Sequence, residues 1–306
     1  MLTTLSGPNS YLLKAELKRR LSQFVELNGD MALEQIDAED ASLDRVREAL
    51  QSMPFLSDKK LVVLRNSGLN KDFTVVASQL LKDVPDVTDV LLVEPAIDRR
   101  TAYAKFLQKQ TDFTEFKELD ESGLAAWLCK AATSQGGEIT IGDARYLITR
   151  VGANQRLLSN ELAKLLSYST IITKQSIDLL TETLPHSTVF NMLEAAFAGN
   201  RSRALSLYKE QRQLGEEPQK LLAMIVWQLH ILAVVKTAGL KAPNQIAAQS
   251  KLSPYTVQKS QAITRAMKLG DLKLLIHVVL ELDIQLKSQP ISADEAIQNL
   301  LITISS

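Results

Sequence analysis

Residues 5–14 read LSGPNSYLLK and follow a short apolar run at the N-terminus. A nucleotide hydrolase carries a phosphate-binding loop, G-x-x-x-x-G-K-[ST], between such a strand and the next helix. Its glycines let backbone N–H groups approach the phosphates, and its lysine reaches them. Here Leu12, Leu13 and Lys14 stand at the G-K-[ST] positions that follow Gly7. Because both the close approach and the cation are missing, the sequence predicts no nucleotide site.

The acidic residues that would hold a magnesium ion are also missing. The apolar run 61–64 is followed by Arg65 and Asn66, where a nucleotide hydrolase carries Asp and Glu. A second apolar run, 90–93, does end at Glu94, but Pro95 follows it. One glutamate without a phosphate loop does not make a hydrolytic site, so we expect no nucleotide hydrolysis.

No other catalytic or metal-binding pattern is present. His186, His230 and His277 lack H-E-x-x-H spacing, and the last two stand in apolar helical runs, so we expect buried histidines. Cys129 follows Trp127-Leu128 and is interpreted as a small core residue. There is no G-x-S-x-G elbow and no zinc-type cysteine pair. We therefore predict no catalytic residue, no metal and no cofactor.

Large apolar residues gather in one connection of the chain. Pro54 ends a helix that Ser42 can cap, and the polar residues 57–60 lead into the next strand, so Met53, Phe55 and Leu56 lie in or beside a loop. Exposed apolar side chains in a cluster indicate a partner site. The alternative is that Phe55 and Leu56 fold back onto the sheet, which the residue types alone slightly favour.

Arg99 and Arg100 follow Asp98 after the run 90–93, at the edge where a parallel sheet presents its loops. Arginines placed there could contact a nucleic-acid backbone. The other interpretation, which the residues favour, is a helix start capped by Asp98 with two solvated arginines.

The first 120 residues alternate strand-like and helical patterns, which predicts an α/β domain with a mainly parallel sheet. Strands are expected at 2–5, 32–36, 61–64, 90–93 and 113–118. Residues 121–184 predict a small helical domain, and residues 185–306 predict an all-helical domain. In the latter we expect helices that end at Gly199 and Gly215 and helices that begin at Pro218, Pro254 and after Ser292.

Composition and charge exclude several classes of protein. The 306 residues are 45% hydrophobic, and 35 basic residues balance 35 acidic ones, so neither a polybasic coat nor an acidic tail is present. The three predicted domains carry 16 basic against 20 acidic, 6 against 6, and 13 against 9 residues, which assigns no nucleic-acid surface to any of them. A single cysteine and no signal-peptide pattern indicate a cytoplasmic protein. The apolar run 221–235 is too short to span a bilayer and predicts a core or subunit-contact helix.

Three segments resemble the delta subunit of the bacterial DNA polymerase III clamp loader: PFLSDKKLVV at 54–63, VGANQRLLSNEL at 151–162 and GEEP at 215–218. The similarity extends over the whole chain and keeps the order of its pieces. It implies an AAA+-like α/β domain that has lost its nucleotide site, a helical lid and a helical collar that assembles the complex. A member of such a family can be classed as a DNA polymerase through its holoenzyme, although no catalytic site is visible here.

The resemblance also implies a mechanical role. Delta-like subunits bind the ring-shaped sliding clamp through apolar residues at the end of a helix and open it, while ATP on neighbouring subunits controls access. The matching positions are Met53, Pro54, Phe55 and Leu56, with Phe55 as the aromatic anchor and Pro54 in place of the usual bulky aliphatic residue. The implied partners are the clamp, the ATPase and delta-prime-like subunits, and primer-template DNA. Two alternatives remain: an ATPase motor subunit of a clamp loader, or an inert AAA+-like scaffold in another DNA-handling complex.

Overall fold

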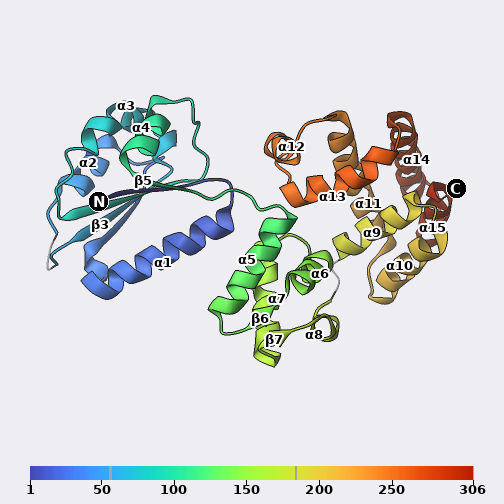
Figure 1. Ribbon diagram of the computed structural model, residues 1–306. Helices are drawn as coiled ribbons and strands as arrows, with labels where there is room; N and C mark the ends of the chain where they lie inside the picture. Colours follow the sequence, from blue (N-terminus) through green and yellow to red (C-terminus); the bar gives the residue numbers. More distant parts are fainter. Residues whose placement is uncertain (55–56, 183–184, 306) are drawn as a thin grey trace. The chain divides into compact units, whose positions relative to one another are not determined.

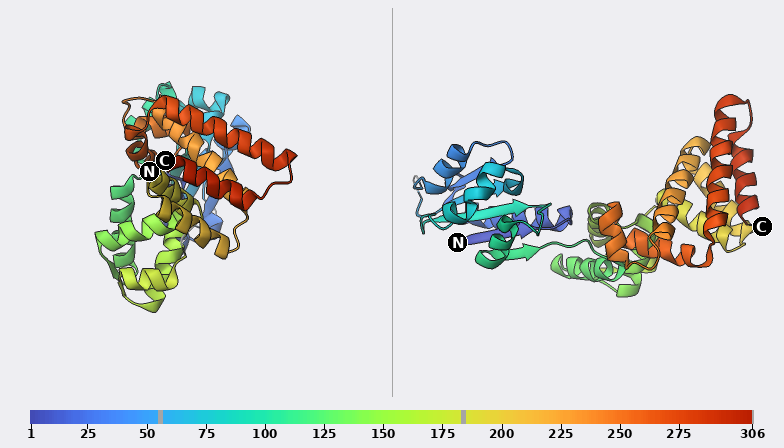
Figure 2. Two further views of the ribbon diagram at one scale, coloured as in Figure 1. Left: turned by 90° about the vertical axis from the view of Figure 1, so that its right-hand side faces the viewer. Right: turned by 90° about the horizontal axis from the view of Figure 1, so that it is seen from above.

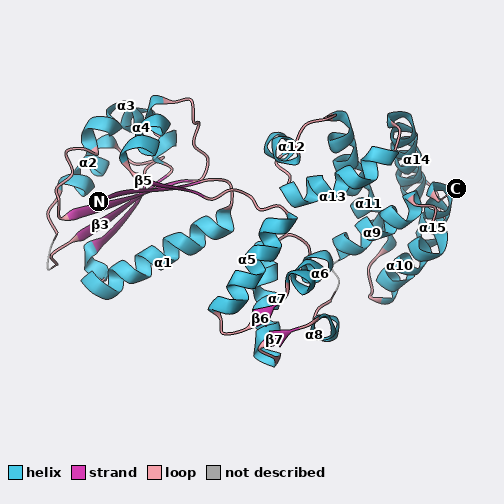
Figure 3. Cartoon of the chain, in the orientation of Figure 1, coloured by secondary structure: helices cyan, strands magenta, loops and turns pink. Residues whose placement is uncertain are grey.

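The computed structural model describes residues 1–54, 57–182 and 185–305, and it divides into two compact units, Met1–Glu118 and Leu119–Ser306 (Figure 1). Strands belong almost entirely to the first unit, as Figure 3 shows. Each unit is described separately below.

A five-stranded parallel sheet forms the centre of the first unit, with the strand order β2-β3-β4-β1-β5. Its strands are β1 (Leu2–Ser6), β2 (Leu33–Asp37), β3 (Lys60–Arg65), β4 (Thr88–Glu94) and β5 (Asp112–Glu115). All five predicted strands are present. The two continuously apolar runs form the neighbouring strands β3 and β4, which are buried on both faces as such runs require.

Helices cover both faces of this sheet. They are α1 (Ser10–Asn28), α2 (Leu43–Gln51), α3 (Lys71–Leu80) and α4 (Ala102–Gln110), with 3₁₀ turns η1 (Asp30–Ala32) and η2 (Ser67–Leu69) between them. Because alternate side chains of a strand point to opposite faces, Leu61 and Val63 pack with α1, whereas Val62 and Leu64 pack with α2, α3 and α4. Figure 1 shows α1 on one side of the sheet and the other three helices on the opposite side.

The second unit begins with four helices around one hydrophobic cluster. These are α5 (Glu121–Ser134), α6 (Ile141–Val151), α7 (Gln155–Tyr168) and α8 (Lys174–Leu180), and they bury Leu128, Leu147 and Leu162 completely. Two short strands pair in parallel within this group: β6 (Glu138–Ile139) lies between α5 and α6, and β7 (Ile171–Ile172) lies between α7 and α8. Two-residue strands give no periodic signal, so the sequence did not predict them.

Seven helices form the rest of the second unit. They are α9 (Pro185–Phe197), α10 (Arg201–Gln213), α11 (Pro218–Thr237), α12 (Pro243–Ser250), α13 (Pro254–Ala266), α14 (Leu269–Ser288) and α15 (Ala293–Ile304). The predicted starts at Pro218, Pro254 and after Ser292 are confirmed, and so are the predicted ends near Gly199 and Gly215. Helices α12 and α14 were not predicted from the sequence. Figure 2 shows α14 and α15 side by side at the C-terminal end of this unit.

Candidate functional site

The connection between α2 and β3 carries the predicted protein-binding residues. Helix α2 begins at the predicted cap, where the Ser42 hydroxyl accepts a hydrogen bond from the Arg45 N–H at 3.3 Å. It ends at Gln51, and the Ser52 N–H donates to the Glu48 carbonyl at 2.9 Å. Proline disfavours helical geometry in the residue before it, so Pro54 explains why the helix does not continue through Met53. The connection lies at the edge of the sheet where the parallel strands begin.

Lys60 ties the end of α2 to the start of β3. Its ammonium donates to the Ala49 carbonyl at 2.8 Å and to the Ser52 hydroxyl at 2.6 Å, and it pairs with Glu34 at 2.7 Å. The residue is 8% exposed. A buried ammonium must have partners, and Lys60 has three, so both ends of the connection are held in place. The loop between Ser52 and Lys60 is therefore presented from a rigid frame.

Within this loop, the structure describes two of the four predicted contact residues. Met53 is 68% exposed, and Pro54 is partly exposed. Phe55 and Leu56 lie outside the described residues. After them, the Ser57 hydroxyl donates to the Lys59 carbonyl at 2.8 Å. The described part of the loop thus presents apolar surface to solvent.

The β1–α1 connection lies at the opposite edge of the sheet, where the strands end. Gly7 has a φ of +121°, and a β-carbon added to it would stand 2.3 Å from the Phe116 carbonyl oxygen. Asn9 is 1% exposed. Its N–H donates to the same carbonyl at 3.0 Å, its side-chain amide donates to the Lys117 carbonyl at 3.2 Å, and its side-chain oxygen caps α1 by accepting from the Leu12 N–H at 3.0 Å. Backbone from residues 116–117 therefore packs directly against the start of α1.

Glu94, at the end of β4, is buried among polar groups. Its carboxylate accepts from the Gly68 N–H at 3.0 and 3.1 Å, from the Tyr103 hydroxyl at 3.1 Å, and from the Ser67 hydroxyl. Burial raises the pKa of this carboxyl, and hydrogen bonds from Ser67, Gly68 and Tyr103 oppose that rise. These contacts hold η2 and α4 to the sheet, which is a structural use of the glutamate.

Arg99 and Arg100, the candidate DNA contacts, both have acidic partners. Arg99 pairs with Glu115, and Arg100 pairs with Asp98 at 2.8 Å, which lowers the pKa of Asp98 to about 2. Both arginines are well exposed. Asp98 does not cap α4 as the sequence suggested: the cap is Thr101, whose hydroxyl accepts from the Ala104 N–H at 3.2 Å.

Two histidine expectations are wrong. His230 is exposed on α11, and the side chain of His277 is 64% exposed on α14, 3.0 Å from Glu281. Apolar neighbours in sequence predicted burial, but both helices carry exposed apolar residues as well. Cys129 is partly buried and donates to the Ile139 carbonyl at 3.2 Å, and burial raises the pKa of its thiol. In the described part of the chain, no group of three or more acidic, histidine or cysteine residues could hold a metal ion.

Two of the three segments that resemble the delta subunit, 151–162 and 215–218, lie at boundaries between helices. In residues 151–162, Gly152 ends α6 with a φ of +84°, and the Asn154 side chain caps α7 by accepting from the Arg156 and Leu157 N–H groups at 3.0 and 3.2 Å. In residues 215–218, Gly215 has a φ of +87°, and Pro218 occupies the first turn of α11. Glycine adopts a positive φ without the steric cost of a β-carbon, so these motifs specify how the helices connect.

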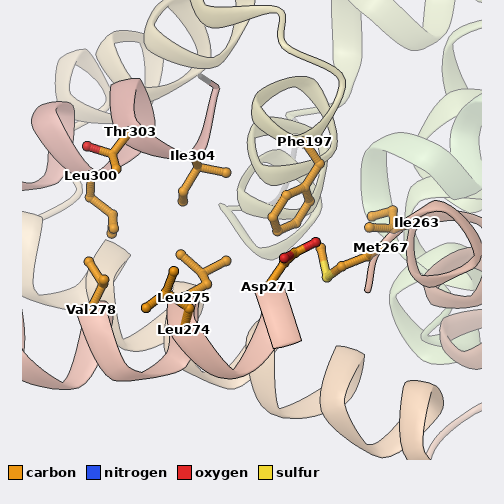
Figure 4. Close-up of a pocket in the computed structure, with 10 residues that line it drawn as sticks. All are labelled: Phe197, Ile263, Met267, Asp271, Leu274, Leu275, Val278, Leu300, Thr303 and Ile304. Carbon is orange, nitrogen blue, oxygen red and sulfur yellow. The ribbon is translucent and has the colours of Figure 1, made fainter. Parts of the chain in front are cut away.

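Apolar surface is also present on the helices from α9 onward. A pocket of about 370 Å³ lies among α9, α13, α14 and α15, and Figure 4 shows Phe197, Leu275 and Ile304 around it. On α14, Leu274, Leu280 and Ile284 are each more than half exposed. Helix α11 is long and apolar enough to cross a membrane by length and composition, but half of its apolar stretch is buried inside the protein, as in a core helix.

Comparison with known proteins identifies the family. Residues 4–117 match the family described as DNA polymerase III, delta subunit, and residues 186–304 match DNA polymerase III delta subunit, C-terminal domain. The chain belongs to the DNA polymerase III delta subunit family. A relative is DNA polymerase III subunit delta of Bacillus subtilis strain 168, which is 22% identical over 301 residues, covering 93% of this chain and 87% of that protein.

A solved structure supports the same fold for the delta family and this chain. The Bacillus subtilis DNA clamp loader delta protein aligns with a TM-score of 0.83 at 21% identity, over 99% of this chain and 95% of that one. The predicted order of an α/β domain followed by helical parts is therefore confirmed. The anchoring role of Lys60 and the contact between Asn9 and Phe116 were not predictable from the sequence, because both join residues far apart in the chain.

Proposed function

We propose that this chain binds the ring-shaped sliding clamp of DNA replication and opens it, and that Met53, Pro54, Phe55 and Leu56 form the contact. The observation that carries the proposal is the α2–β3 connection, which Lys60 anchors at both ends and which exposes Met53. Apolar anchors on a fixed frame lose little conformational freedom when they bind a partner. Each fully buried large side chain would contribute about 1.5–3 kcal/mol to the contact.

The chain would do this without hydrolysing ATP itself. Leu12 and Leu13 stand where a phosphate loop has its second glycine and its lysine, and the Phe116 backbone packs against Gly7. Arg65 and Asn66 follow β3 in place of magnesium-binding acids. Opening would then use binding energy alone, with ATP acting on neighbouring subunits.

Assembly would use the helical part of the chain. We propose a lid at 121–184 and a collar at 185–306, within a hetero-oligomer that contains ATPase and delta-prime-like subunits and acts on primer-template DNA in the cytoplasm. The lid residues form one hydrophobic cluster, in which Tyr255 of α13 also takes part, and most of the collar's apolar residues form a second. The exposed apolar residues of α14 provide surface for neighbouring collars.

The test is the affinity of the full chain for its purified sliding clamp, measured by surface plasmon resonance. The double variant Phe55→Ala, Leu56→Ala is expected to lose at least a hundredfold in affinity, because two buried anchors together contribute several kcal/mol. Met53→Ala should weaken binding less.

A matched control is Val75→Ala on α3, which removes an equally apolar side chain that is 81% exposed. It should bind the clamp like the unmodified chain, and all variants should keep their circular dichroism spectra. Clamp affinity that does not change in the double variant would show that the chain is an inert scaffold or binds through another surface.

The ATPase alternative has its own measurement. Equilibrium dialysis of the full chain with ATP and magnesium should show no binding at concentrations that saturate a nucleotide hydrolase. Saturable binding would support a motor subunit instead.

A further inference from the structure

Positive charge is concentrated in one segment of the second unit. Residues 218–270, which include α11, α12 and α13, contain seven lysines and arginines and no aspartate or glutamate. The balance over residues 185–306, 13 basic against 9 acidic, hides this segment, because all nine acids lie outside it. A stretch without acids cannot neutralise its own cations.

Most of these cations have no acidic partner among the residues that the structure describes. Lys220 pairs with Glu216 at 2.6 Å, and the Lys259 ammonium lies 4.0 Å from the centre of the Phe190 ring. Among the described residues, the other five form no ion pair: Lys236, Lys241, Lys251, Arg265 and Lys268. Three of them meet in one cavity.

This cavity, of about 490 Å³, lies between the end of α11, the connection 238–242, the start of α12 and the last turn of α13. Lys236, Lys241 and Arg265 line it, and none of its described lining residues is acidic. The Lys236 ammonium donates to the Thr264 carbonyl at 2.8 Å, and the Lys241 ammonium donates to the Gln249 side-chain oxygen at 3.0 Å. Both acceptors are neutral, so they do not compensate the positive charges of Lys236 and Lys241. Each ammonium group also has two further N–H groups that can donate to a ligand.

The walls of the cavity are held in place by polar contacts. The Gln261 amide donates to the Lys241 carbonyl at 3.3 Å, and the bond from Lys236 to Thr264 joins α11 to α13. Helix α12 begins at Pro243, which lines the cavity, and the Ala242 N–H before it donates to the Gln245 side-chain oxygen at 3.3 Å. Its N-terminal end therefore adds a partial positive charge to the same cavity.

We propose that this cavity and the basic surface of α11–α13 around it bind the phosphate backbone of DNA. Three cations line one cavity, which exceeds what a single phosphate ion would require and suits a chain of phosphates. Lys251, directly after α12, and Lys268, directly before α14, add positive charge in the same segment. The contact would be independent of base sequence, because lysine and arginine at phosphates carry no sequence information.

The cavity is a better DNA site than the arginines after β4. Arg99 and Arg100 each face a carboxylate, which would have to be displaced before a phosphate could bind. Lys236, Lys241 and Arg265 have no such competitor among the described residues. The inference does not depend on the clamp-binding loop, which lies in the first unit.

The experiment measures fluorescence anisotropy of a labelled single strand and its duplex with the full chain at several salt concentrations. The triple variant Lys236→Gln, Lys241→Gln, Arg265→Gln should bind at least tenfold more weakly at low salt. Because about 0.7–0.9 of a counterion is released per phosphate contact, its slope of log affinity against log salt should fall by about 2. The matched control Arg47→Gln, Lys71→Gln, Lys105→Gln removes the same charge from exposed positions of the first unit.

Support requires that the cavity variant loses DNA affinity while the control does not, and that both still bind the sliding clamp. Equal loss in both variants would overturn the proposal in favour of net charge. Inorganic phosphate that competes with DNA more strongly than sulfate at equal ionic strength would overturn it in favour of a free phosphate site. A variant that binds DNA normally but no longer joins the other clamp-loader subunits would assign the surface to an acidic protein partner.

Discussion

At the scale of single residues, the chain uses positions associated with nucleotide chemistry for structure. Gly7, which could begin a phosphate loop, lies against the Phe116 backbone, and Asn9 joins the start of α1 to residues 116–117. Glu94, which could have been a catalytic acid, holds η2 and Tyr103. Gly7, Asn9 and Glu94 therefore each have a structural role in the first unit.

Gly7→Ala tests how closely this edge of the sheet is packed. The new β-carbon would meet the Phe116 carbonyl, so we expect the free energy of unfolding to fall by about 3 kcal/mol or more. Gly29→Ala is the matched control, because Gly29 also has a positive φ, +82°, but has nothing within 4 Å of the added carbon. It should lower the free energy by only about 1 kcal/mol. Hydrogen exchange of the β1 and β4 amides measures the change in free energy of unfolding in both variants. Equal losses of stability in the two variants would contradict the close packing of Gly7 against Phe116.

The raised pKa of Glu94 predicts that the free energy of unfolding depends on pH. Because burial raises its pKa in the folded chain, the folded chain holds this proton to a higher pH than the unfolded chain, whose carboxyl titrates near 4.5. The stability that Glu94 contributes is complete below that value and is lost as the pH rises through the folded pKa. Glu94→Gln cannot ionise, so the stability of the unmodified chain relative to this variant should fall as the pH rises above about 4.5. Urea unfolding followed by circular dichroism measures the difference in free energy of unfolding between the two proteins. A difference that does not change with pH would contradict the burial of an ionisable carboxyl.

At the scale of elements, the proposed clamp-binding loop depends on the last turn of α2. The Lys60 ammonium replaces the missing hydrogen bond of the Ala49 carbonyl and fixes Ser52, so the helix end and β3 move together. A cation near a helix C-terminus also interacts favourably with the helix dipole. The position of the loop is therefore fixed by α2 and β3, which flank it, and not by contacts within the loop.

Lys60→Met should therefore loosen the loop without unfolding the sheet. The change leaves the Ala49 carbonyl without its donor and leaves Glu34 with Arg45 as its remaining cationic partner, so we expect a loss of about 1–3 kcal/mol in the free energy of unfolding. Amide exchange near Ser52 should become faster. Lys59→Met is the control, because Lys59 is 56% exposed and 3.9 Å from Asp89, and it should cost less than about 1 kcal/mol. Equal effects of the two variants would show that Lys60 does not anchor the loop.

The elements were predictable where local signals agree. Continuous apolar runs gave β3 and β4, and Ser42, Pro218 and Ser292 marked the starts of helices. Long-range contacts were not predictable, so neither Lys60 nor Phe116 could be assigned a role from the sequence. The sequence favours a helix start capped by Asp98, but the cap of α4 is Thr101. The charge of whole domains also hid the acid-free segment 218–270, which a shorter window would have shown.

At the scale of the whole molecule, the chain is a delta-family protein whose proposed work depends on binding energy. The proposed clamp-binding loop is at the edge of the sheet where strands begin, whereas the Gly7 contact is at the edge where they end. The loop's Lys60 anchor and the Gly7 contact share no residue, so binding at the loop need not involve the other edge. Exposed apolar residues on α14 are available for assembly with other subunits.

The most direct test of the central claim measures opening of the ring without nucleotide. A sliding clamp labelled with a pair of self-quenching fluorophores across its subunit interface is titrated with the full chain in the absence of ATP. We predict that fluorescence rises to saturation with the unmodified chain and does not rise with the Phe55→Ala, Leu56→Ala variant. A clamp that stays quenched, or that opens only after ATP is added to the chain alone, would contradict the account.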